Sequence, residues 1–477
     1  MAKKAKSVTV SETENFRLEA DSIGTKQVPV DALYGVQSLR AKENFPITGE
    51  RMNPVFIRSM AQLKKACAIA NMKAKELTPE QAEVIIAACD KIIAGEYLDE
   101  FIVDPIQGSA GTSMNMNANE VIANIAIVSM GGKPGQYDMI HPNDHVNRGQ
   151  STNDIIPSAG KITTLFLLDR LDKSLATLEK ELLKKAKQFD GILKMGRTQL
   201  QDAVPMRLGQ EFNAYATAVA RGRQRIRKAS EEMTALNMGA TAIGTAINAN
   251  PKYFNTVVKE ISKVTGKKFT QAEDLIDGTM NIESFAAVSG AVRDTAVALS
   301  KMSNDLRLLS SGPRTGIGEI NLPAMQNGSS IMPGKVNPVI PEVVNQAAFR
   351  VIGNDVTIAM AAEGGQMELN AFEPITFYSL FQSIEILANA VDTLTENCIK
   401  GITANKQRCD DLMHASVGIV TALAPIIGYQ ASANLAKEAL KTNVPVKVLA
   451  VQKGIMTEEQ LNEVLDPYKL TEPPVRK

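Results

Sequence analysis

Long apolar repeats with helical spacing constrain the fold of this chain more than any other feature. Between Phe377 and Cys398, large apolar residues recur every three or four positions, with Pro374 near the start and Gly401 just past the end. Comparable repeats occupy four further segments: residues 168–182, 208–233, 285–309 and 341–362. The segment 341–362 is apolar on more than one face, which predicts burial by neighbours on several sides. The sequence therefore predicts a mainly α fold with a central long-helix bundle.

The length of 477 residues indicates about three domains. We predict a mixed N-terminal domain over residues 1–150, the helix bundle over residues 151–405 and a small helical domain over residues 406–477. Lys plus Arg equals Asp plus Glu at 52 each, so no net charge favours nucleic acid or an anionic membrane.

Several features favour a cytoplasmic protein. The basic start Lys3-Lys4-Ala5-Lys6 is not followed by the apolar stretch of a secretory signal. No apolar run approaches the ~20 residues of a membrane span. The four cysteines show no paired metal spacing, which predicts buried thiols in a reducing compartment.

One loop carries the strongest chemical signal. The run from Gly328 to Pro338 reads GSSIMPGKVNP and combines serines, a lysine and an amide between glycines and prolines. Such a loop suits abstraction of a proton next to a carboxylate, because Lys335 and Asn337 present positive charge and a donor where negative charge develops. A serine becomes a plausible base only if loop N–H groups and a nearby cation stabilise its alkoxide. We predict Ser329 as that base; the alternative is a surface loop with incidental serines.

Three more polar strips precede this loop. They are Gly111–Glu120 (GTSMNMNANE), His141–Asp154 (HPNDHVN, then QSTND) and Gly196–Asp202 (GRTQLQD). A substrate with two carboxylates is best held by many neutral donors, because several lysines would bind other anions equally well. The run Ser151–Asp154 has a second interpretation as the N-terminal cap of the following helix, and both interpretations are compatible.

These four strips, in this order, resemble the signatures of the aspartase/fumarase superfamily, and the resemblance covers the chain from about Phe16 onward. It implies a three-domain aspartase/fumarase-like fold and a small dicarboxylate substrate. It also implies a homotetramer in which each active site takes strips from three chains. The residues that it implies for catalysis are Ser329, Lys335 and Asn337. The residues that it implies for substrate binding are Thr112, Ser151, Thr152, Asn153, Thr198, Gln199 and Ser330.

The residue after Thr198 bears on the reaction. Fumarases carry a histidine there, whereas this chain has Gln199, which cannot act as an acid. Loss of ammonia needs no proton donor, because the ammonium already carries its protons. We therefore expect a carbon–nitrogen lyase that converts L-aspartate reversibly to fumarate and ammonia. The alternatives are a class II fumarate hydratase and a non-catalytic scaffold that keeps the lyase fold.

Two positions depart from the family pattern: Ala246 replaces a usual glycine, and Ile156 replaces a common aromatic residue. Both bear on substrate preference. No cofactor is expected to be required, and activation by a divalent cation is left open. With three histidines in the chain, of which only His141 and His145 are close in sequence, we expect no metal site. These two histidines are expected to structure their loop or to line a secondary anion site.

Overall fold

The computed structural model describes residues 15–472, so the basic start Lys3–Lys6 lies outside the described residues. The chain divides into two units. Unit 1 comprises the residues up to Leu171 together with Arg225–Arg293 and Arg350–Ile386. Unit 2 comprises Asp172–Gln224, Asp294–Phe349 and the residues from Leu387 onward. The three domains that we assigned from the sequence, with boundaries at residues 150 and 405, stay a prediction.

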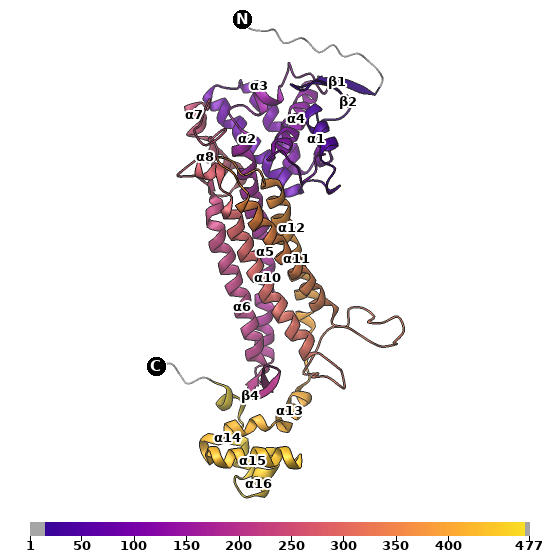
Figure 1. Ribbon diagram of the computed structural model, residues 1–477, viewed down its shortest axis with the longest axis vertical. Coiled ribbons are helices and arrows are strands. Elements are labelled where there is room, and N and C mark those ends of the chain that lie inside the picture. Colours follow the sequence, from indigo (N-terminus) through magenta and orange to yellow (C-terminus); the bar gives the residue numbers. More distant parts are fainter. Residues whose placement is uncertain (1–14, 473–477) are drawn as a thin grey trace. The chain divides into compact units, whose positions relative to one another are not determined.

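The five long helices are confirmed. They are α5 (Thr152–Gln188), α6 (Leu208–Ala229), α10 (Glu283–Leu309), α11 (Val339–Glu363) and α12 (Glu373–Asn397) (Figure 1). Each contributes a segment to both units. Helix α6 runs without a break through Gly222, where a Cβ would lie 2.9 Å from the Thr295 hydroxyl of α10. Gly222 thus marks a close approach of two helices.

Aromatic rings fill the bundle core of unit 1. Phe377 of α12 contacts Phe285 of α10 and Phe56 of α2 (Pro54–Ala74), with ring centroids 5.1 Å and 5.7 Å apart. Gly160 of α5 lets Phe377 approach, since a Cβ there would lie 2.5 Å from the ring. Three of the five long helices therefore meet around one phenylalanine.

In unit 2, polar contacts join the same helices. Arg223 of α6 pairs with Asp172 and Glu179 of α5 at 2.9 Å and 2.6 Å. The Asn345 amide of α11 donates to the Ser300 hydroxyl of α10 at 2.8 Å. These polar contacts, of which the Asn345–Ser300 contact is buried, fix the register between neighbouring helices.

Shorter elements complete unit 1. The helices are α1 (Val36–Asn44), α2, α3 (Pro79–Ala94), α4 (Thr112–Ser129), α7 (Pro251–Phe254), α8 (Val257–Thr265) and α9 (Asp277–Met280). Strands β1 (Phe16–Ala20) and β2 (Thr25–Pro29) form an antiparallel hairpin, and β5 (Ala235–Leu236) pairs in parallel with β6 (Thr270–Gln271). Two 3₁₀ turns, η1 (Leu98–Glu100) and η3 (Ser230–Thr234), and the wider turn η2 (Pro142–Val146) connect them.

Unit 2 contains two small antiparallel pairs and a helical end. Strand β3 (Leu193–Thr198) pairs with β4 (Gln201–Arg207), and β7 (Ile320–Asn321) pairs with β8 (Thr403–Ala404). The helices are α13 (Lys406–Ala415), α14 (Val420–Ile427), α15 (Tyr429–Thr442), α16 (Val446–Gln452), α17 (Glu458–Val464) and α18 (Pro467–Thr471), with 3₁₀ turns η4 (Ile399–Gly401) and η5 (Val417–Ile419). Apolar residues between Ile419 and Leu465 form a separate hydrophobic cluster.

Helix α11 differs from its sequence-based expectation. Burial on several sides was predicted, but in the single chain Phe349, Val356 and Met360 are 63%, 57% and 69% exposed. Their spacing of seven and four residues places them on one face of the helix. The apolar character of α11 was predicted correctly, but no part of the chain between residues 15 and 472 covers this face.

All four cysteines are buried, as predicted: Cys67, Cys89, Cys398 and Cys409. Among the described residues, no single helix has the length and apolarity to cross a membrane; only the bent pair Lys406–Ala415 and Val417–Ile427 meets both criteria together.

Candidate active site

The Ser329 loop is a tight hairpin in unit 2. Asn327 and Val336 form an antiparallel bridge, and the Gly328 N–H donates to the Lys335 carbonyl at 2.7 Å. The Asn337 side-chain amide donates to the Gly328 carbonyl at 3.0 Å. A Cβ at Gly328 would lie 2.8 Å from the Lys335 carbonyl oxygen, so only glycine fits where the two arms cross. The glycine thus brings Ser329, Lys335 and Asn337 into one turn.

Backbone donors surround the Ser329 hydroxyl. Its Oγ accepts the N–H groups of Ile331 at 3.2 Å and Met332 at 3.0 Å. Two N–H groups aimed at one oxygen favour negative charge on that oxygen. Ser329 is half-buried, whereas Ser330 and Lys335 are exposed and free to meet a ligand.

The turn that carries Thr198 and Gln199 is a two-residue hairpin connection between β3 and β4. Gln199 and Leu200 both have positive φ, at 52° and 63°. Hairpin turns of this form favour Asn or Gly, because other side chains are strained there. Strain of this kind is common at functional sites. Here it holds Gln199 exposed at the tip.

Thr112 opens helix α4 in unit 1, directly after Gly111 at a φ of 84°. The Thr112 side chain is exposed at this helix N-terminus, where the helix dipole favours an anion. The N–H groups of Thr112 and Ser113 themselves donate to Ser109. Ile156, one of the two family departures, is fully buried against the turn: a Cβ at Gly111 would lie 2.6 Å from its Cγ2. Ile156 therefore packs against the Gly111 turn that precedes Thr112.

The capping interpretation of the Ser151 strip has structural support, whereas substrate binding by this strip stays a prediction. Ser151 accepts the Asn153 N–H at 3.1 Å, and its own N–H donates to the Asp154 carboxylate at 3.0 Å, so the strip caps α5. Asp154 is fully buried, and burial raises its pKa to about 7. The Asn153 amide donates to the Ala242 carbonyl at 2.7 Å. The half-buried side chains of Ser151, Thr152 and Asn153 thus stand on a fixed helix end.

A buried lysine behind this strip was not predicted. Lys64 of α2 is fully buried, and its ammonium donates to the side-chain oxygens of Asn147 and Gln150 at 2.8 Å each. Burial lowers the pKa of Lys64 to about 8. Asn115 of α4 completes the network by donating to Asn147 at 3.2 Å and to the Thr152 hydroxyl at 3.3 Å. The first and second strips are therefore joined through Asn115.

Ala246, the second departure, adopts a φ of 55°, in the region that favours glycine. Its N–H donates to the Ala240 carbonyl at 2.9 Å, which holds the turn despite the methyl group. Left-handed backbone at a non-glycine residue costs roughly 1–2 kcal/mol. The substitution therefore keeps the expected turn at the expense of local strain.

Thr112 faces a cleft of about 520 Å³ in unit 1, which Arg40, Gln37 and His141 also line. Its floor is fixed by a buried carboxylate, Glu120, the last residue of the first strip. One Glu120 oxygen accepts the N–H groups of Gly35 and Ser38 and the Ser38 hydroxyl, and the other accepts the Gln37 N–H at 2.9 Å. Glu120 thus caps helix α1, which carries five residues of the cleft, Gln37 and Arg40 among them.

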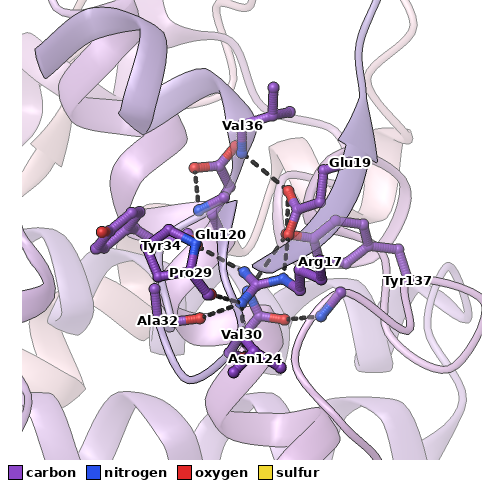
Figure 2. Close-up of polar contacts among 12 residues, drawn as sticks. Arg17, Glu19, Pro29, Val30, Ala32, Tyr34, Val36, Glu120, Asn124 and Tyr137 are labelled. Carbon is purple, nitrogen blue, oxygen red and sulfur yellow. Dashed lines mark hydrogen bonds and ion pairs between the residues drawn. The ribbon is translucent and has the colours of Figure 1, made fainter. Parts of the chain in front are cut away.

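Figure 2 shows a buried ion pair, Arg17–Glu19, that also holds the start of helix α1 beside Glu120. Arg17 pairs with Glu19 at 2.7 Å and donates to the carbonyls of Pro29, Val30, Ala32 and Tyr34. Glu19 accepts the Val36 N–H at 2.8 Å. Burial, with the nearby charge of Glu19, raises the pKa of Glu120 to about 7, although the Ser38 hydrogen bond lowers it.

The two histidines structure their own turn, as one of the two interpretations predicted. The His141 N–H donates to His145 Nδ1 at 2.9 Å, and His141 Nδ1 accepts the N–H groups of Asn143 and Asp144. Among residues 15–472, no group of three or more His, Cys, Asp or Glu side chains could hold a metal ion.

The predicted site residues therefore fall into two sets. Unit 1 holds Thr112, Ser151, Thr152 and Asn153, and unit 2 holds Thr198, Gln199, Ser329, Ser330, Lys335 and Asn337. Within unit 1, the Asn115 contacts bring the two donor strips together. Within unit 2, one loop brings the three predicted catalytic residues together.

Comparison with known proteins places this fold and these strips in a family. A lyase family model matches residues 24–353, and a model of the fumarase C C-terminus matches residues 419–472. An aspartate ammonia-lyase of a Bacillus species is 51% identical over 96% of this chain and 98% of its own. That of Escherichia coli (strain K12) is 47% identical over 97% of each.

Solved structures agree with the sequence relatives. A fumarate lyase:delta crystallin of Brucella melitensis bound to cobalt superposes with a TM-score of 0.93 at 46% identity, covering 96% of this chain and 100% of the other. A class II fumarase of Schistosoma mansoni gives 0.90 at 31% identity, covering 95% and 99%. The chain therefore belongs to the aspartase/fumarase superfamily of lyases and, within it, to the aspartate ammonia-lyases.

Proposed function

We propose that this protein catalyses the reversible elimination of ammonia from L-aspartate to give fumarate, with Ser329 as general base. The Ser329 alkoxide takes a proton from Cβ of L-aspartate, the carbon between the side-chain carboxylate and the carbon that carries the ammonium. The electron pair moves onto the side-chain carboxylate. The pair then returns to form the carbon–carbon double bond as the carbon–nitrogen bond breaks. Ammonia leaves as a neutral molecule. No step in this sequence needs a cofactor.

The observation that carries this proposal is the pair of backbone N–H groups on Ser329 Oγ, from Ile331 and Met332. Lys335 and Asn337, on the returning arm of the same loop, supply charge and a donor for the carboxylate on which charge develops. Thr112, Ser151, Thr152, Asn153, Thr198, Gln199 and Ser330 are proposed as neutral donors that bind the substrate carboxylates. Gln199 favours ammonia over water as the leaving group, because an amide cannot protonate a departing hydroxide.

We expect fumarate to form from L-aspartate and not appreciably from L-malate. The measurement is fumarate absorbance during separate incubations with each substrate, with and without Mg²⁺, so that a requirement for a divalent cation is read in the same assay. Faster release of fumarate from L-malate would support the fumarate hydratase alternative and contradict the proposal. If the folded protein releases no fumarate from either substrate, the result would favour the alternative of a non-catalytic scaffold.

We further propose a homotetramer in which three chains contribute to each active site, in the cytoplasm. The exposed apolar face of α11 supports this assembly, because exposed seams of this spacing are covered by helices of another subunit. The division of the predicted residues between two units is compatible with sites built from more than one chain.

Light scattering in solution is expected to give a mass of about four chains of 51.4 kDa. Replacing Phe349 by Glu on the exposed face should dissociate the assembly and abolish activity, whereas replacing the exposed Glu83 of α3 by Gln should change neither. A stable, active monomer would refute the tetramer and the shared sites together.

A further inference from the structure

A buried cluster of charges lies at the base of the Thr198–Gln199 hairpin in unit 2. Glu319 is fully buried, and its Oε1 accepts a hydrogen bond from Arg197 of β3 at 2.8 Å. The ammonium of Lys194, also of β3, lies 3.0 Å from Oε2 without the alignment of a hydrogen bond. Lys194 in turn donates to Glu211 of α6 at 2.8 Å. Arg197 and Lys194, two cations of one strand, therefore pair with the single buried carboxylate of Glu319.

The backbone around Glu319 is equally constrained. Its N–H donates to the Leu309 carbonyl at the end of α10, and its carbonyl accepts the Asn405 N–H, each at 2.9 Å. Arg408 of α13 donates to the carbonyls of Gly316 and Ile317 at 3.0 Å. The Glu319 carboxylate therefore projects from a backbone that hydrogen bonds with α10, Asn405 and α13 hold in place.

The same backbone leads directly into the Ser329 loop. Strand β7 begins at the residue after Glu319 and pairs with β8, and a Cβ at Gly401 would lie 2.4 Å from the Pro323 ring, so the chain runs close against this glycine. On the other side of the cluster, Arg197 is the residue before Thr198. The Glu319 carboxylate therefore lies where two segments begin, the Thr198–Gln199 hairpin and the chain that leads to the Ser329 loop. Both are proposed to contact the substrate.

We propose that Glu319 is a positioning residue. It fixes the Thr198–Gln199 hairpin through Arg197 and Lys194, and it fixes the root of the Ser329 loop, which follows it in the chain. The proposal rests on the function proposed above. A buried carboxylate between two cations is weak evidence for a stabilising role, since a buried ion pair often adds little stability over apolar packing. Fixed geometry is the property that such a cluster supplies, and a displacement of about 1 Å at a reacting group can cost 10²-fold in rate.

Glu319→Gln keeps the shape of the side chain and removes its charge. We expect kcat to fall about 10–100-fold, because the Thr198–Gln199 hairpin and the Ser329 loop each lose the anchor that fixes them in the active site to which they contribute. Binding of succinate, a dicarboxylate that does not react, should stay within about threefold, because every substrate-contacting side chain is retained. Hydrogen exchange of backbone amides in residues 322–337 should accelerate, since the loop root is released.

The matched control is Glu179→Gln, the same substitution in the Arg223 ion pair of the same unit, away from both segments. It should change neither kcat nor the exchange of residues 322–337. Glu319→Gln with kcat within twofold of the parent, or with unchanged exchange of the loop, overturns the proposal. An equal effect of the control also overturns it.

If Glu319→Gln does not fold, Arg197→Lys decides by the same criteria, because lysine keeps the positive charge and loses the planar donor geometry. Hydrogen exchange requires no substrate. The exchange data therefore decide the positioning role of Glu319 even if the parent protein releases no fumarate from L-aspartate. The positioning role and the proposed function are thus tested separately.

Discussion

Ser329→Ala is expected to lower kcat by about 10²–10⁴-fold while leaving dicarboxylate binding nearly intact. The substitution removes the oxygen that receives the N–H groups of Ile331 and Met332, and it removes nothing that would hold a carboxylate. Lys335→Ala should damage both turnover and binding, because one ammonium would hold the ground-state carboxylate and stabilise the charge that develops on it.

Size alone will not separate these roles, since losing a donor to the developing charge costs a comparable ~10²–10³-fold in rate. The deciding measurement is titration of both variants with succinate. Ser330→Ala, the neighbouring hydroxyl, is the comparison within the loop and should weaken binding with a small loss of kcat. Near-normal turnover by Ser329→Ala would show that the base lies elsewhere.

Glu120→Gln is expected to lower the stability of the folded protein by about 1–3 kcal/mol at pH 8. An amide in place of the carboxylate turns one oxygen into a donor, which must then face a buried N–H of Gly35, Gln37 or Ser38. That leaves the start of helix α1 without its cap. The measurement is the denaturant midpoint of both proteins at equal concentration, with Glu83→Gln as the exposed control.

The pH dependence of this loss has a definite sign. Burial raises the pKa of Glu120 from 4.5 to about 7, so the folded chain binds this proton more tightly than the unfolded chain. The resulting stabilisation is fully present below about pH 4.5 and disappears as the pH rises through about 7. Glutamine does not titrate, so the deficit of Glu120→Gln should be larger at pH 5 than at pH 8. A deficit that grows towards pH 8 would instead show a carboxylate stabilised by its N–H donors.

The long helices were predictable because their apolar spacing repeats over many turns and is local in sequence. Phe377 illustrates this: its position in the repeat predicted burial, and it lies in the core of the bundle. The exposed face of α11 was not predictable in the same way. Phe349 has the same residue type and spacing as a core residue, and only the tertiary arrangement shows that residues 15–472 leave it exposed.

For the candidate site, the prediction that this chain is an ammonia-lyase is confirmed by its relatives. The chemistry that the residue types of the Ser329 loop indicate stays a prediction. Lys64 was missed because its partner Asn147 is 83 positions away and nothing in α2 distinguishes a buried lysine from a solvated one. Glu319 was missed for the same reason, since its cluster is assembled from separate elements.

If Ser329 is the base, as proposed, the confinement of its activation to one short loop has an evolutionary consequence. Both donors to Ser329 Oγ are backbone N–H groups of that loop, so they persist whatever side chains occupy the distant strips. Mutations in the Thr112, Ser151 and Thr198 strips can therefore alter which molecule is accepted without disabling proton abstraction. We expect a chain organised in this way to acquire a new leaving group through single substitutions, and we propose Gln199 as the position at which such a change of chemistry occurs.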